Sequence, residues 1–182
     1  MFEEEIDMLD DLLKSALQEQ KIVSIYRDPE DSGKCFTGFV GAIDEDEVLI
    51  YHLTPSGMYD GYILVNRDDI FQVDYDGRYE KKIEFLSKVK KQSHEEIEIA
   101  EEGILHSLLS FAQEKGFMTY IGFEDSSLTG LIRNFDDKEI CLDVFTNYGE
   151  SDGISAVSVD AIEEISVDSV EEQDILLLKL HL

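Results

Sequence analysis

Thr37-Gly38-Phe39-Val40 returns as Thr129-Gly130-Leu131-Ile132, ninety-two residues further along this chain of 182 residues. Other short matches keep the same spacing, among them Asp60-Gly61 against Asp152-Gly153. A repeat of this length is a whole folding unit that has been duplicated in tandem. We therefore predict two domains of similar size, covering residues 1–91 and 92–182.

Each unit shows the pattern of one helix followed by five short strands. In the first unit, apolar residues at helical spacing predict a helix over 2–20, and β-branched and aromatic runs predict strands near 21–27, 36–43, 47–53, 61–66 and 70–75. In the second unit we expect a helix over 94–113, with Ser93 as its N-cap and Glu96 completing a capping box. The second set of strands is expected near 117–123, 129–135, 139–146, 154–159 and 162–167.

Five strands without a helix between them are typical of a small β-barrel. The predicted fold class is therefore mostly β with helices (α+β). The expected architecture is two tandem five-strand barrels, each preceded by an N-terminal helix.

Residues 78–92 predict a helical connector between the two units. It ends in the chain's one basic cluster, Lys88, Lys90 and Lys91. Lysines at the end of a helix favourably oppose its dipole, so a solvated helix end is the simpler interpretation. The alternative is a patch that contacts phosphates.

The last eight residues are strongly apolar and match the connector of the first unit. An apolar stretch of this kind needs a cover, either at the contact between the two domains or on another subunit. We therefore predict an interaction surface made of Ile175, Leu176, Leu177, Leu178, Leu180 and Leu182.

The chain carries 42 acidic against 15 basic side chains, a net charge of −27. Residues 1–91 hold 21 acidic and 11 basic side chains (−10), and residues 92–182 hold 21 and 4 (−17). This charge disfavours nucleic-acid binding, which depends on neutralising phosphates, and it suits solubility or a basic partner. Two unmatched cysteines, with no signal peptide and no long apolar run, predict a soluble cytoplasmic protein.

No catalytic or metal-binding motif stands out in the sequence. The four histidines have no metal-ligand spacing with each other or with a cysteine, and there is no nucleophile elbow or phosphate-binding glycine loop. The recurring Asp-Gly pairs are common turn signals. We therefore expect a protein that is not an enzyme and that uses no cofactor and no metal.

The segment from Val23 to Tyr75 resembles an Sm-like (LSm) domain, although SH3-like barrels of other families share its pattern. The resemblance is carried by 23–26, by Thr37-Gly38 in a bent strand before an acidic hairpin, and by the apolar strands 48–51 and 62–73. Sm proteins bind single-stranded RNA, and the positions that match their RNA contacts here are Asp46 and Arg67. In the second unit the position of Arg67 is held by Val159.

Three functions remain open from the sequence. The first is a non-enzymatic, acidic interaction or regulatory module that binds a protein partner or another copy of itself. The second is an Sm-like RNA-binding protein that uses Asp46, Arg67, Lys88, Lys90 and Lys91, which the net charge disfavours. The third is an acidic inhibitor or immunity protein for a basic partner.

Overall fold

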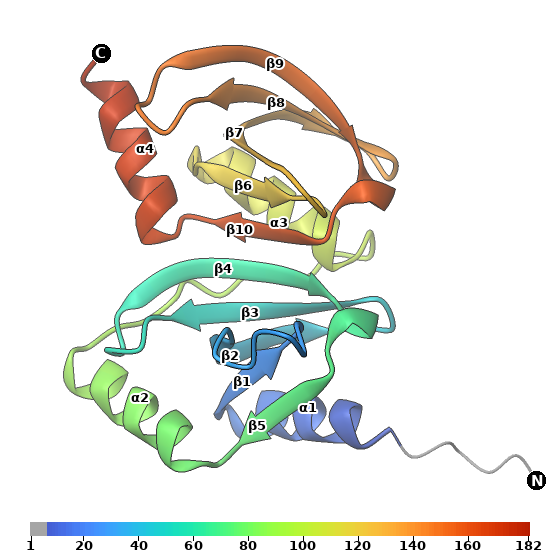
Figure 1. The fold of residues 1–182 in the computed structure, drawn as a ribbon, viewed down its shortest axis with the longest axis vertical. Coiled ribbons are helices and arrows are strands. Elements are labelled where there is room, and N and C mark those ends of the chain that lie inside the picture. The colour runs from blue at the N-terminus through green and yellow to red at the C-terminus, as the bar shows by residue number, and fades with distance from the viewer. Residues whose placement is uncertain (1–6) are drawn as a thin grey trace, which may run out of the picture.

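The computed structural model describes residues 7–182. These residues form four α-helices, ten strands and two short 3-10 turns (Figure 1). The first repeat contains α1 (Met8–Glu19), β1 (Ile22–Tyr26), β2 (Phe36–Ile43), β3 (Glu47–Leu53), β4 (Tyr59–Asn66), η1 (Arg67–Asp69), β5 (Gln72–Tyr75) and α2 (Arg78–Val89). The second contains α3 (Ile104–Lys115), β6 (Thr119–Gly122), β7 (Ser127–Phe135), β8 (Glu139–Phe145), β9 (Ser151–Ser158), η2 (Val159–Ala161), β10 (Glu164–Val167) and α4 (Val170–Leu180). The predicted domain boundary at 91 and 92 falls in the linker between α2 and α3.

The ten strands form one continuous, open antiparallel sheet, which is not closed into the two five-strand barrels that the sequence predicted. The strand order is β5-β1-β2-β3-β4-β10-β6-β7-β8-β9. Within each repeat the fifth strand pairs with the first, as β5 does with β1 and β10 with β6. Closure would require β4 to pair with β5, but β4 pairs instead with β10 of the other repeat, as Figure 1 shows. The coarser prediction, an α+β protein, is confirmed.

The repeated Thr-Gly pair has a steric cause. A Cβ atom on Gly38 would lie 2.1 Å from the carbonyl oxygen of Tyr51, and one on Gly130 would lie 2.4 Å from that of Asp143. Only glycine permits the backbones of β2 and β3, or of β7 and β8, to come so close. A register shift follows shortly after each glycine, between Val40 and Ala42 and between Ile132 and Asn134. Bulges of this kind bend a sheet, and both repeats carry theirs at equivalent positions.

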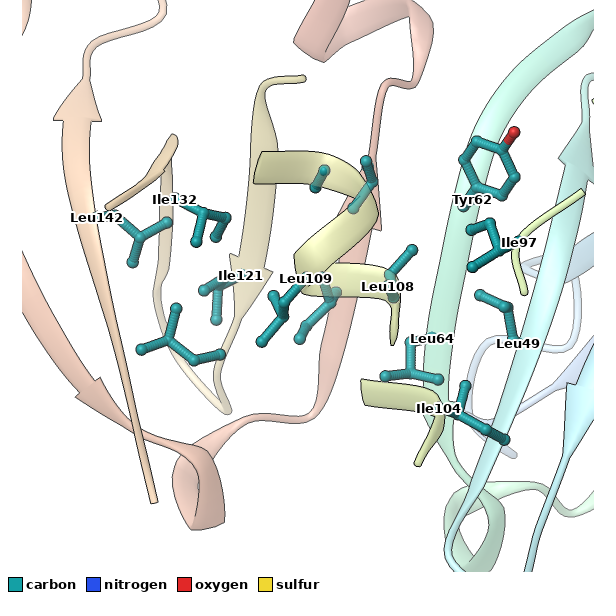
Figure 2. Close-up of a cluster of buried hydrophobic side chains, with 14 of the residues drawn as sticks. Leu49, Tyr62, Leu64, Ile97, Ile104, Leu108, Leu109, Ile121, Ile132 and Leu142 are labelled. Atoms are coloured by element: carbon teal, nitrogen blue, oxygen red, sulfur yellow. The ribbon is translucent and has the colours of Figure 1, made fainter. Parts of the chain in front are cut away.

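The hydrophobic core runs across both repeats. Leu49, Tyr62 and Leu64 of the first repeat pack with Leu108 of α3, and Leu109 of α3 lies among apolar residues of β6, β7 and β8 (Figure 2). A second cluster lies within the first repeat, where Ile63 and Val65 of β4 pack with residues of α1, β1, β2 and β3. Strand β4 is therefore buried on both faces, which explains its uninterrupted apolar run.

The predicted helix over 94–113 is wrong in its first ten residues. Helix α3 begins at Ile104 with Gly103 as its N-cap, and Ser93 and Glu96 form no capping box. Residues 93–103 instead cross over the first repeat as a linker without regular structure. The Tyr62 hydroxyl donates to the carbonyl of Glu95 (2.8 Å), and the amide of Ile97 donates to the Tyr51 hydroxyl (2.9 Å). These bonds use groups that a helix would pair internally, so tertiary contacts override the local pattern.

The other helices agree with the sequence more closely. The connector predicted over 78–92 is α2, and α1 covers the described part of the helix predicted over 2–20; residues 2–6 of that prediction lie outside the described residues. A capping box does occur in the chain, at α4, where Ser169 and Glu172 bond each other's backbone amides.

Candidate interaction surfaces

Arg67 and Asp46 lie together, but the Arg67 side chain is already engaged. The backbone amide of Arg67 donates to the carbonyl of Asp46 at 2.8 Å. The guanidinium pairs with the carboxylates of Asp7 and Asp10 at the start of α1, with the Asp10 oxygen at 3.2 Å. Only 12% of the Arg67 side chain is exposed. Its charge therefore holds α1 against the β4–β5 turn and is turned away from solvent.

The three lysines lie at the other end of β4 from Arg67. Lys90 donates from Nζ to the carbonyl of Ser56, in the loop before β4, at 2.6 Å. Arg67 directly follows the last residue of β4, which is eight residues long. At roughly 3.3 Å per residue the strand separates the two groups by about 26 Å. The structure therefore does not join the candidate RNA contacts into one cationic surface.

The C-terminal residues form α4, and most of its leucines face solvent. Ile175 is buried and Leu176 is partly buried, whereas Leu177, Leu178, Leu180 and Leu182 are exposed, Leu182 to 81%. The contact between the repeats therefore does not cover this stretch, which was one of the two covers expected from the sequence. The exposed residues Leu177, Leu178, Leu180 and Leu182 are called the α4 leucine face below.

Residues at the start of β4 form hydrogen bonds between the two repeats. The Asp60 carboxylate accepts a hydrogen bond from the amide of Val170, the first residue of α4, at 2.9 Å. The Nδ1 atom of His52 lies 3.1 Å from the other Asp60 oxygen. Burial raises the pKa of Asp60, but the bonds from His52 and Val170 outweigh it and leave the pKa below its usual value. Asp60 is thus a cap for a helix of the other repeat, a role that the Asp-Gly turn signal did not reveal.

Aromatic rings gather where the linker crosses β3 and β4. The His94 ring lies 5.4 Å from the Tyr51 ring in a stacked arrangement, 4.6 Å from the Tyr59 ring and 5.3 Å from the Tyr62 ring, measured between centroids. Its Nε2 atom lies 2.9 Å from the carbonyl oxygen of Gly61, which can only accept, so Nε2 carries the proton. Burial lowers the pKa of His94 to about 4. His94 is therefore a neutral part of the junction between the repeats.

Strands β5 and β9 are the two edges of the described sheet. Strand β9 is exposed along most of its length, and Ile154 is 58% exposed, whereas its repeat equivalent Tyr62 is 1% exposed. The difference is visible in the sequence, because the apolar run of β4 becomes an alternation with serine in β9. Unpaired edges of this kind offer backbone donors and acceptors to another strand.

Residues 7–182 contain no group of three or more potential metal ligands. None of the helices in this part of the chain is long and apolar enough to cross a membrane. A hollow of about 350 Å³ lies between the end of α1 and the linker, lined by Phe39, Tyr51 and Leu53 together with His94 and Glu96. Its walls are mainly apolar.

Comparisons with known proteins find no match: no family model, no curated protein and no solved structure matches the chain. The class that the structure defines is therefore an α+β protein with a tandem repeat joined through one ten-stranded antiparallel sheet.

Proposed function

We propose that this protein is a non-enzymatic interaction module that binds a protein partner through the α4 leucine face. The observation that carries the proposal is the exposure of four leucines within six residues, three of them on α4 and Leu182 just beyond its end. Apolar groups gathered on a surface in this way are characteristic of interaction sites. The order of one helix and five strands in each repeat also supports the Sm-like resemblance, although the sheet is open.

The charge around the α4 leucine face indicates the kind of partner. The second repeat carries −17, and the exposed Glu171 and Asp174 lie on α4 itself. In the first repeat the positions of Leu180 and Leu182 are held by lysines, Lys88 in the last turn of α2 and Lys90 just after it. The partner is therefore a protein with an apolar contact patch surrounded by basic residues, and electrostatic steering would speed its association.

The chain provides a matched control for testing this proposal. Leu177 on α4 and Phe85 on α2 are repeat equivalents, 56% and 64% exposed. Leu177→Glu and Phe85→Glu therefore make the same change on equivalent helices. The assay is capture of proteins from a cell extract, measured by quantitative mass spectrometry. We expect basic proteins that bind the unaltered protein to be lost with Leu177→Glu and to stay bound with Phe85→Glu.

Two results would contradict the proposal. One is that no protein binds the unaltered chain more than it binds Leu177→Glu. The other is that both variants lose the same proteins, since the α4 leucine face would then have no special role. Thermal unfolding of both variants shows whether each is folded, so that a lost partner is assigned to the surface.

A further inference from the structure

Helices α2 and α4 hold equivalent positions in the two repeats, and equivalent loops fix them there. A Cβ atom on Gly57 would lie 2.7 Å from the backbone nitrogen of Ser87 in α2, and one on Gly149 would lie 2.4 Å from that of Lys179 in α4. Both glycines have a positive φ, +76° and +78°. The loops before β4 and β9 therefore pack closely against the inner side of the two helices, and the outer side of each helix faces solvent.

The outer side of α2 combines apolar and cationic side chains. Phe85 and Val89 lie one turn apart and are 64% and 62% exposed. Lys82 and Lys88, three residues before and after Phe85, are exposed as well. Residues 78–91 carry six basic and two acidic side chains, a local charge of +4 in a chain of −27. The residues Lys82, Phe85, Lys88 and Val89 are called the α2 face below.

The α4 leucine face has the complementary composition. Leu177 and Leu180 are 56% and 67% exposed. Asp174 lies one turn before Leu177, Glu171 lies one turn before Asp174, and both are exposed. Neither carboxylate forms an ion pair with another described residue. Contact between the two faces would thus bury apolar side chains of both helices and bring lysines towards carboxylates.

The two helices are also placed so that one rotation can join them twice. Figure 1 shows α2 and α4 on the same side of the molecule, one beside each repeat. A two-fold axis at this side places α2 of each copy against α4 of the other. We propose that two copies form this symmetric dimer, in which the α2 face of each copy covers the α4 leucine face of the other. The second copy is then the cover on another subunit that the apolar C-terminal stretch requires.

The dimer would regulate the site of the proposed function, and this step rests on that function. A basic partner and the α2 face share one chemistry, apolar groups among cations, so they compete for the α4 leucine face. The partner therefore has to displace the second copy, which lowers its apparent affinity. Phe85→Glu should give a monomer that retains basic proteins at least as well as the unaltered protein. Leu177→Glu should lose both the dimer and these proteins.

The test of the dimer is sedimentation velocity of the full chain over concentrations up to the submillimolar. Moderate salt largely screens the long-range repulsion between two chains of −27. We expect a monomer–dimer equilibrium. Glu171→Lys with Asp174→Lys in one chain should reduce the dimer several-fold, as should Lys82→Glu with Lys88→Glu in another, because each change places like charges at both contacts. All four substitutions in one chain should restore the dimer, since the charges are then exchanged.

The net charge of the variants provides the control. Glu171→Lys with Asp174→Lys changes the net charge from −27 to −23, so an association governed by net charge would become stronger and not weaker. Asp125→Lys with Asp137→Lys makes the same change on two exposed turns and should dimerise at least as well as the unaltered protein. The chain with all four helix substitutions keeps the net charge of −27. Thermal unfolding shows whether each variant is folded.

Three results would overturn the dimer. They are a chain that stays monomeric at every concentration, a dimer that neither double variant weakens, and assembly into species larger than a dimer. None of them affects the binding of basic proteins to the α4 leucine face, which the capture assay with the Leu177 and Phe85 variants tests separately. Conversely, a dimer with the expected variant behaviour that captures no basic protein would support the dimer and contradict the proposed partner.

Discussion

At the scale of single residues, His94 is the clearest case of a charge state that the fold determines. Its ring lies against Tyr51, Tyr59 and Tyr62, and His52 and Asp60 are the titratable groups nearest to it. Burial is the largest cause of its lowered pKa, and the hydrogen bond to Gly61 and the charge of Asp60 oppose that effect only in part. The junction thus accommodates a neutral imidazole.

We therefore expect acid to weaken the fold through His94. The pKa is about 4 in the folded protein against 6.5 for an unperturbed histidine, so between these values the unfolded chain binds more protons. Stability from this group is complete above pH 6.5 and is lost as the pH falls towards 4, by roughly 3 kcal/mol at the limit. The measurement is the free energy of unfolding in urea, for the unaltered protein and for His94→Gln, at several pH values between 7 and 4.

The pH dependence of stability must be compared with that of His94→Gln, because a second group, Glu47, changes the stability in the opposite sense. Burial raises the pKa of Glu47 to about 7, so its ionisation destabilises the fold as the pH rises above about 4.5. Glu47 is present in both proteins, so its effect cancels in the difference between them. His181→Gln, at the exposed C-terminus, should behave as the unaltered protein. Parallel pH curves for the unaltered protein and His94→Gln would show this account of His94 to be wrong.

At the scale of helices and strands, local patterns predicted most of the elements but not their partners. All ten strands overlap their predicted ranges, because alternation and turn residues act over a few neighbouring positions. Strands β1, β5, β6 and β10 are two or three residues shorter than predicted, and β9 begins at Ser151 instead of Ile154. The helix start at Ser93 was wrong because Tyr51 and Tyr62, distant in sequence, bind the backbone of the linker. The sequence feature that fits the pairing of β4 with β10 is the apolar run of β4, because a strand that is buried on both faces does not alternate apolar and polar residues.

The start of helix α4 is capped by Asp60 of the other repeat, and the equivalent residue Asp152 provides a control for testing this cap. Asp60→Ala removes the acceptor of the Val170 amide and the partner of His52, and should lower the free energy of unfolding by about 0.5–2 kcal/mol. Asp152→Ala removes the equivalent carboxylate, which is exposed and forms no hydrogen bond or ion pair with the described residues. Its effect should stay within about 0.5 kcal/mol. Urea unfolding measures both, and equal losses would contradict the capping role of Asp60.

At the scale of the whole molecule, the positions of the charged residues bear on RNA binding more than the net charge does. Among the candidate RNA contacts, Asp46 and Arg67 came from the resemblance, and the structure does place them side by side. The sequence could not indicate that Asp7 and Asp10 occupy the Arg67 guanidinium, since that contact depends on how α1 packs on the sheet. The lysines at the end of α2 lie at the opposite end of β4. The cationic side chains that could contact phosphates are therefore isolated from one another within a strongly acidic surface.

We expect no binding of U-rich or A-rich single-stranded RNA at moderate salt, measured by fluorescence anisotropy of labelled oligonucleotides. Affinity for single strands depends on several phosphates being neutralised together, and here the separated cations are outweighed by a net charge of −27. Arg67→Glu should instead lower the midpoint of thermal unfolding, because it places a third carboxylate beside Asp7 and Asp10. Lys88→Glu, which makes the same charge change on an exposed helix end, should leave that midpoint nearly unchanged. Micromolar RNA binding that weakens with salt and disappears in Arg67→Glu would show that Arg67 is released from α1 to contact phosphate, and the interaction-module proposal would then lose its advantage over RNA binding.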